Sequence, residues 1–115
     1  MNKNTSLYEY VSLDLFSEIE GITSRRMFGG YGFYYYGKFF AIISDGKLFF
    51  KVGEGNREDY ERYFSTPFIY TSRGKEVELP FCELPPDIME EKNGLLEWIE
   101  KAASQKTKSS KKHRT

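Results

Sequence analysis

The chain has 115 residues, a length typical of one domain, and its ten Phe and nine Tyr supply enough apolar surface for a single core. Such an aromatic content excludes a wholly disordered chain, and no segment approaches the roughly 20 apolar residues that span a bilayer. The N-terminus has no apolar signal stretch. The single cysteine, Cys82, excludes an intrachain disulfide and fits a reducing compartment. We therefore expect a cytoplasmic protein with no membrane contact.

The formal net charge of zero conceals an uneven distribution along the chain. Residues 1–105 contain 17 acidic and 12 basic side chains, a net charge of about −5. The remaining bases are Lys106, Lys108, Lys111, Lys112 and Arg114. We expect residues 1–104 to form one acidic domain and residues 105–115 a disordered basic tail. Nucleic-acid-binding folds usually carry a basic face, so we expect only weak, non-specific nucleic-acid contact, through the tail.

Helical periodicity comes first in the chain. Residues 5–20 carry one apolar stripe, with Ser6 as N-cap, Glu9 completing a capping box and Gly21 as the terminating residue. From residue 22 the period changes to two. This change predicts strands over residues 22–28 and 33–36, separated by a glycine cluster.

Two turn signals organise the next segment. Gly37-Lys38 precedes a predicted strand over residues 39–43, and Asp45-Gly46 precedes another over residues 47–52. Connections this short permit only antiparallel neighbours. These strands therefore form a meander.

The second half predicts a helix, a hairpin and a final helix. Asn56 caps a helix ending near Phe64, and strands follow over residues 68–71 and 77–79, with Pro80 ending the second. A last helix begins at Pro86 or Asp87 and runs through Ala102. The fold class is α+β, in the order α-βββ(β)-α-ββ-α. It has a twisted antiparallel sheet of five to six strands, with N-terminal, middle and C-terminal helices on one side.

Two segments resemble known binding motifs, but their neighbouring residues and elements do not match those motifs. Residues 32–38 have the spacing of a phosphate-binding loop but lack the Ser or Thr and the helix that must follow. Residues 30–36 resemble an RNA-recognition signature but lie in the wrong element order. His113 is the only histidine, and Cys82 has no Cys or His at ligand spacing. We expect no metal, no cofactor and no catalytic residues, hence no enzyme.

Paired arginines suggest an anion or partner site. Arg25, Arg26 and Lys51 are candidates, but successive strand residues face opposite sides, so only one arginine shares a face with Lys51. Surface ion pairing is the commoner role for such residues.

The run Arg26-Met27-Phe28-Gly29-Gly30-Tyr31-Gly32 is more distinctive than its parts. With Gly37-Lys38, Phe40-Ala41, Asp45, Lys51, Pro67-Phe68, Tyr70, Gly74, Pro85 and Trp98, it resembles the N-terminal domain of the TfoX (Sxy) family, from about Leu7 to Ala103. The resemblance implies a secretion-chaperone-like fold and a bacterial cytoplasmic protein. It also implies kinship with competence regulators that act as co-activators with the cyclic-AMP receptor protein. It brings no catalytic residues, and Leu79-Pro80-Phe81 departs from the family's usual Met-x-Tyr strand.

Three hypotheses follow. The first is a non-enzymatic protein-binding module in transcriptional regulation, whose partner is a regulator or the transcription machinery, with a homodimer left open. Its candidate surface comprises Arg25, Arg26, Phe28, Gly29, Gly30, Tyr31, Gly32 and Lys51. The alternatives are a nucleic-acid binder using the tail and the sheet aromatics, and an unrecognised small-ligand-binding protein or enzyme.

Overall fold

Four antiparallel strands joined by tight turns follow the first helix. The computed structural model describes residues 2–27 and 29–106. The first half contains α1 (Lys3–Tyr10), the π-helical turn η1 (Val11–Leu15), β1 (Ile22–Met27), β2 (Gly30–Tyr35), β3 (Lys38–Ser44) and β4 (Lys47–Lys51). The second half contains α2 (Arg57–Glu61), β5 (Pro67–Ser72), β6 (Lys75–Glu83), α3 (Pro86–Glu90), the 3-10 turn η2 (Lys92–Gly94) and α4 (Leu95–Ser104).

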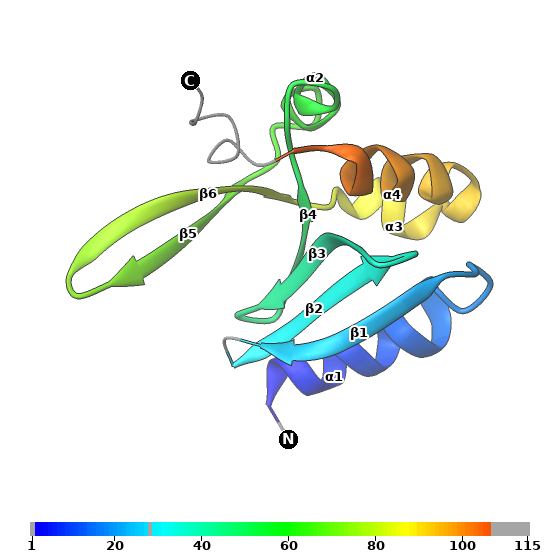
Figure 1. The fold of residues 1–115 in the computed structure, drawn as a ribbon, viewed down its shortest axis with the longest axis horizontal. Helices are drawn as coiled ribbons and strands as arrows, with labels where there is room; N and C mark the ends of the chain where they lie inside the picture. The colour runs from blue at the N-terminus through cyan, green and yellow to red at the C-terminus, as the bar shows by residue number, and fades with distance from the viewer. Residues whose placement is uncertain (1, 28, 107–115) are drawn as a thin grey trace.

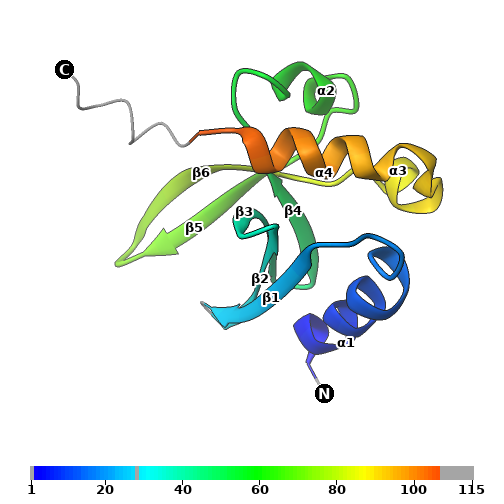
Figure 2. The ribbon, with the colours of Figure 1, turned by 45° about the vertical axis from the view of Figure 1, so that its right-hand side comes forward.

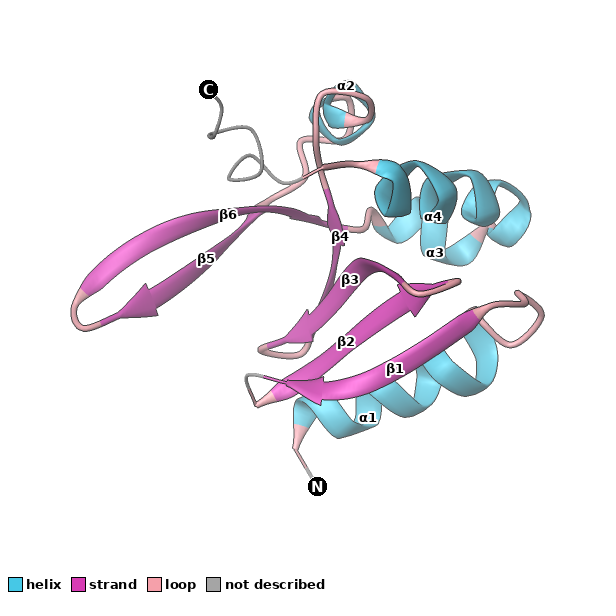
Figure 3. Ribbon diagram, viewed as in Figure 1, coloured by secondary structure: helices cyan, strands magenta, loops and turns pink. Residues whose placement is uncertain are grey.

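The strands form one antiparallel sheet in the order β1-β2-β3-β4-β6-β5 (Figures 1 and 3). Residues 52–66, which include α2, carry the chain from β4 to β5, and β6 then returns to pair with β4. The predicted α+β class, element order and antiparallel sheet are confirmed.

The main core lies between the sheet and α1, η1 and α4. Phe16, the residue that follows η1, packs edge-on against Phe33, with ring centroids 5.3 Å apart, and also contacts Phe40. α4 contributes Leu95 and Ile99, both fully buried. The opposite face carries a smaller cluster built from strand residues alone, namely Ile42, Phe49 and Phe81, with Phe39, Phe68 and Leu79 packed around it.

The first helix begins earlier than predicted. Asn2, rather than Ser6, is its N-cap and accepts a hydrogen bond from the Thr5 N–H. Asn4 ties this start to the sheet, because its side chain donates to the Gly29 carbonyl and accepts from the Gly46 N–H. Tertiary contacts therefore override the capping-box signal.

Three further boundaries were predicted wrongly. The glycine cluster is part of β2, since Gly30 and Gly32 both pair with β1. Pro80 does not end β6. It lies one residue beyond the last β4–β6 pair, where its carbonyl accepts from the Val52 N–H at 2.8 Å and its missing N–H leaves this contact with one hydrogen bond in place of two. The single last helix is instead α3, η2 and α4, broken at Glu91, whose ψ of 58° is not helical.

Candidate functional site

Side-chain hydrogen bonds of Asn56 hold the turn that leads the chain away from the sheet where β4 ends. The side chain of Asn56 is buried, accepts from the Gly53 N–H at 2.8 Å and donates to the Lys51 carbonyl at 3.0 Å. Gln105, just after α4, accepts from the Gly55 N–H. Asn56 therefore caps this turn, although it makes no side-chain cap to α2 as predicted.

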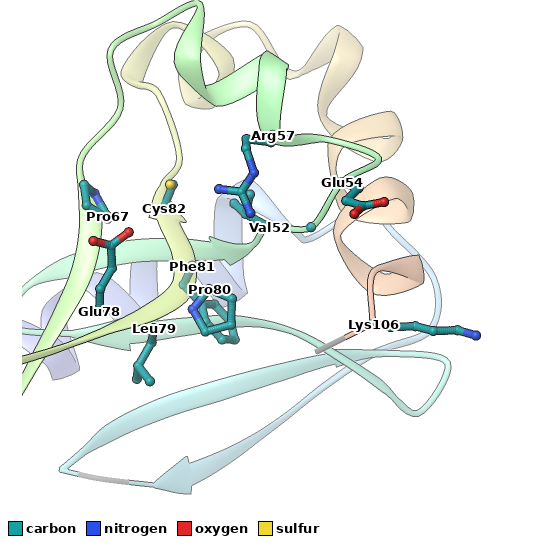
Figure 4. A pocket seen from close by; sticks show the side chains of 11 residues that line it. Val52, Glu54, Arg57, Pro67, Glu78, Leu79, Pro80, Phe81, Cys82 and Lys106 are labelled. Carbon is teal, nitrogen blue, oxygen red and sulfur yellow. The ribbon is translucent and has the colours of Figure 1, made fainter. Parts of the chain in front are cut away.

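Because β4 stops while β6 continues, a cleft of about 640 Å³ opens beside β6. Figure 4 shows β6 along one side, the loop after β4 and the start of α2 on the other. Alternate β6 residues, Glu78, Pro80 and Cys82, line it. Arg57 faces them from α2.

The cleft carries both signs of charge and a neutral thiol. Arg57 and Lys106 contribute two positive charges, and Glu54 and Glu78 two negative ones. Burial, opposed by Arg57, raises the pKa of the Cys82 thiol. A raised pKa keeps the sulfur protonated at neutral pH, the reverse of what a nucleophilic cysteine needs. The cleft therefore suits polar recognition better than thiolate chemistry.

Beyond the cleft, β5 and β6 project from the body as a two-stranded ribbon, as the two views of Figures 1 and 2 agree. In an antiparallel strand, the backbone groups of alternate residues point to the same edge. Since the Pro80 carbonyl points toward β4, the backbone groups of Glu78 and Glu76 point to that side too, where no strand among the described residues pairs with them. β6 therefore offers an open edge to the cleft.

The outer strand β5 is the other open edge. The Thr66 carbonyl accepts from the Glu83 N–H at 2.9 Å, so residues 66, 68 and 70 point their backbone toward β6. The backbone groups of Ile69 and Thr71 then point away from the sheet. Within the part of the chain that the structure describes, no strand pairs with the outward backbone groups of either edge of the ribbon.

The predicted arginines lie on β1, on opposite faces. The Arg25 guanidinium lies 5.9 Å from the centroid of the Tyr34 ring, and that of Arg26 lies 5.9 Å from the centroid of the Tyr31 ring. Both arginines are exposed. Each therefore lies along an aromatic ring on the neighbouring strand.

The glycines of the motif allow close packing inside the sheet. A Cβ on Gly30 would collide with the Ile43 carbonyl, and one on Gly32 would lie 2.5 Å from the Met27 side chain. Gly29 has a φ of +75° and turns the chain between β1 and β2. Phe28 lies outside the described residues.

Lys51 is separated from both arginines. It lies on β4, which β2 and β3 separate from β1 in the sheet, and its Nζ donates to the Gln105 carbonyl at 3.2 Å. Burial lowers the pKa of its ammonium group. The structure therefore does not assemble the predicted anion site from these three residues.

Of the predicted tail residues, Lys106 lines the cleft. Lys108, Lys111, Lys112 and Arg114 lie outside the described residues. Sequence reasoning missed the cleft, since Arg57, Glu78 and Cys82 meet only because β4 is shorter than β6. Within residues 2–27 and 29–106, no group of three His, Cys, Asp or Glu side chains could hold a metal ion.

The comparisons with known proteins give one family. The family model described as the TfoX N-terminal domain matches residues 14–106. No curated protein matches the chain. Among the residues that the structure describes, no helix has the length and apolar character needed to cross a membrane.

Proposed function

Because the chain belongs to the TfoX N-terminal domain family, we propose that it is a non-enzymatic protein-binding module acting in transcriptional regulation. It takes an extended segment of a partner protein as an added strand beside β6. The observation that carries this proposal is the open β6 edge, which β4 leaves unpaired next to a cleft.

Strand addition supplies affinity through backbone bonds. Within the described residues, the N–H and C=O groups of Glu76 and Glu78 have no strand partner on this side, and an extended segment antiparallel to β6 satisfies them. The segment then occupies the position that β4 would fill if it were longer.

The cleft supplies selectivity. Pro80 and Cys82 provide the less polar part of the lining, while Glu78 and Arg57 stand on either side. A partner segment with an apolar side chain flanked by charges of both signs fits this lining. The exposed Arg25 and Arg26 remain candidate contacts for another region of the same partner.

A residue-specific photocrosslink tests the proposal. A photoreactive phenylalanine at Glu78 is expected to join the chain to a partner protein in bacterial lysate, whereas the same group at exposed Lys38, the first residue of β3, is not. Identification of the joined protein as a transcription regulator or polymerase subunit supports the regulatory part. Equal crosslinking from both positions contradicts the proposed site.

Two variants separate backbone pairing from charge. Glu78→Pro removes an N–H that makes no bond in the sheet, so the domain should fold, yet strand addition is blocked. Glu78→Gln keeps the N–H and removes the charge. The crosslinked partner, used as probe, should lose binding to the proline variant and retain most of it with the glutamine variant. Loss with both variants points to a charge contact instead.

A further inference from the structure

We infer that a second copy of this chain pairs with β5, so that two molecules share one continuous antiparallel sheet. This surface lies on the opposite edge of the ribbon from the cleft. The inference therefore stands independently of the proposed function.

The two outer edges of the sheet differ in how they are protected. β1 is an edge strand carrying Arg25 and Arg26, and such charges discourage pairing with another chain. β5 has the sequence Pro-Phe-Ile-Tyr-Thr-Ser and carries no charge. Its only features that discourage pairing with another chain are Pro67 and the register irregularity between Pro67 and Phe68, both at its N-terminal end.

Exposed apolar side chains gather around this unprotected edge. Ile69 and Tyr70 on β5 and Val77 opposite Tyr70 on β6 each expose more than two fifths of their surface. Phe64, in the loop leading to β5, is 93% exposed. Tyr70 and Val77 extend the apolar cluster of the strand-only face outward along the ribbon, whereas Ile69 lies on the other face, and nothing within the described residues of one copy covers these three side chains.

One register makes the edge self-complementary. If Ile69 lies opposite Ile69 of the other copy, the outward backbone groups of the two residues bond each other across a two-fold axis. Thr71 then donates to the Pro67 carbonyl of the other copy, and because proline has no N–H, this pair forms one hydrogen bond in place of two. Phe68 faces Tyr70 of the other copy, an aromatic cross-strand pair on the same face.

Charge complementarity supports the same register. It places the turn at Arg73 beside residues 64–66 of the other copy. Two acidic residues are adjacent to that segment: the Glu61 carbonyl accepts from the Phe64 N–H, and the Glu83 N–H donates to the Thr66 carbonyl. Within the described residues, neither these acids nor Arg73 form an ion pair.

The test is the mass of the full chain in solution. One strand and its flanking loop make a small interface, so the dimer should be weak. Sedimentation should therefore be measured at protein concentrations from about 5 to about 500 µM. The mass is expected to rise from 13.5 kDa toward twice that value. A wild-type chain that stays monomeric throughout overturns the inference.

Matched variants at Ile69 keep the test specific. Ile69→Pro removes the central N–H at a position where an edge strand tolerates proline, and it should abolish the dimer while leaving the circular-dichroism spectrum unchanged. Ile69→Val should dimerise as the wild type does. Arg73→Glu should weaken dimerisation about two- to fivefold. A folded proline variant that still dimerises places the interface elsewhere and overturns the inference.

Discussion

Gly30→Ala provides a sharp test of how the glycine motif is used. Gly30 pairs with Met27 at the start of β2, and its Cα faces β3 so closely that an added Cβ would overlap the Ile43 carbonyl oxygen and lie 3.1 Å from its carbon. Both atoms belong to backbone. No side chain can therefore rotate away to make room.

The cost follows from what must move. Admitting the methyl group separates the ends of β2 and β3 and weakens one or two ladder bonds, each worth about 1 kcal/mol. Overpacking strain adds about 1–2 kcal/mol. We expect the free energy of unfolding to fall by about 3 kcal/mol.

Urea unfolding of three alanine variants isolates the cause. Gly94→Ala has open space and an ordinary φ, so it should change stability by less than about 0.5 kcal/mol. Gly29→Ala also has open space but a φ of +75°, so it should cost about 1 kcal/mol. If Gly30→Ala costs no more than Gly94→Ala, the close-approach explanation is refuted.

Three further predictions concern buried polar groups. Asn56→Ala should lower the free energy of unfolding in urea by about 2–3 kcal/mol, because two backbone groups near the end of β4 lose their partner. Asn4→Ala, whose hydrogen bonds are more exposed, should lower it by about 1 kcal/mol. Equal losses would contradict the role of Asn56 in holding the turn after β4. Tyr60→Phe should gain about 1 kcal/mol, since the buried hydroxyl has no partner among the described residues. Burial raises the pKa of Tyr60, so above about pH 10 the Tyr60 hydroxyl ionises in the unfolded chain before it does in the folded one. The wild type should therefore lose stability relative to Tyr60→Phe as the pH rises above this value. Parallel pH profiles of the two proteins would contradict this prediction. Burial lowers the Lys51 pKa, so at alkaline pH the unfolded chain binds more protons than the folded one. Wild-type stability relative to Lys51→Met should therefore rise as the pH increases toward 10.5, the ordinary lysine pKa, and a fall would contradict this.

Much of the fold could be predicted because its signals are local. The turns at Gly37 and at Asp45-Gly46 fixed the meander of β2, β3 and β4, and both turns have the positive φ that such hairpins require. The family resemblance rested on a motif that the family match now supports. These features depend on neighbours within a few residues.

The errors came from long-range contacts. Asn2 caps α1 because the helix start is tied to turns 25 and 42 residues away, through Asn4. Pro80 continues a strand because its neighbour β4 has already ended. For the same reason, the cleft between Arg57 and β6 depends on strand length and could not be foreseen from spacing.

The predicted surface was only partly placed by sequence reasoning. Alternation along a strand correctly put Arg25 and Arg26 on opposite faces. It gave no information on sheet order, which separates Lys51 from both. Hydrogen bonding to Gln105, far along the chain, then determines where its ammonium group lies.

The most direct test of the central claim is residue-resolved NMR of the ¹⁵N-labelled chain, titrated with the partner protein identified by crosslinking. The account predicts that the amide signals of Glu76 and Glu78 shift and become protected from hydrogen exchange, while those of α1 stay unchanged. Signal changes confined to α1 and β1, with β6 unaffected, would contradict the claim that the open edge of β6 binds the partner.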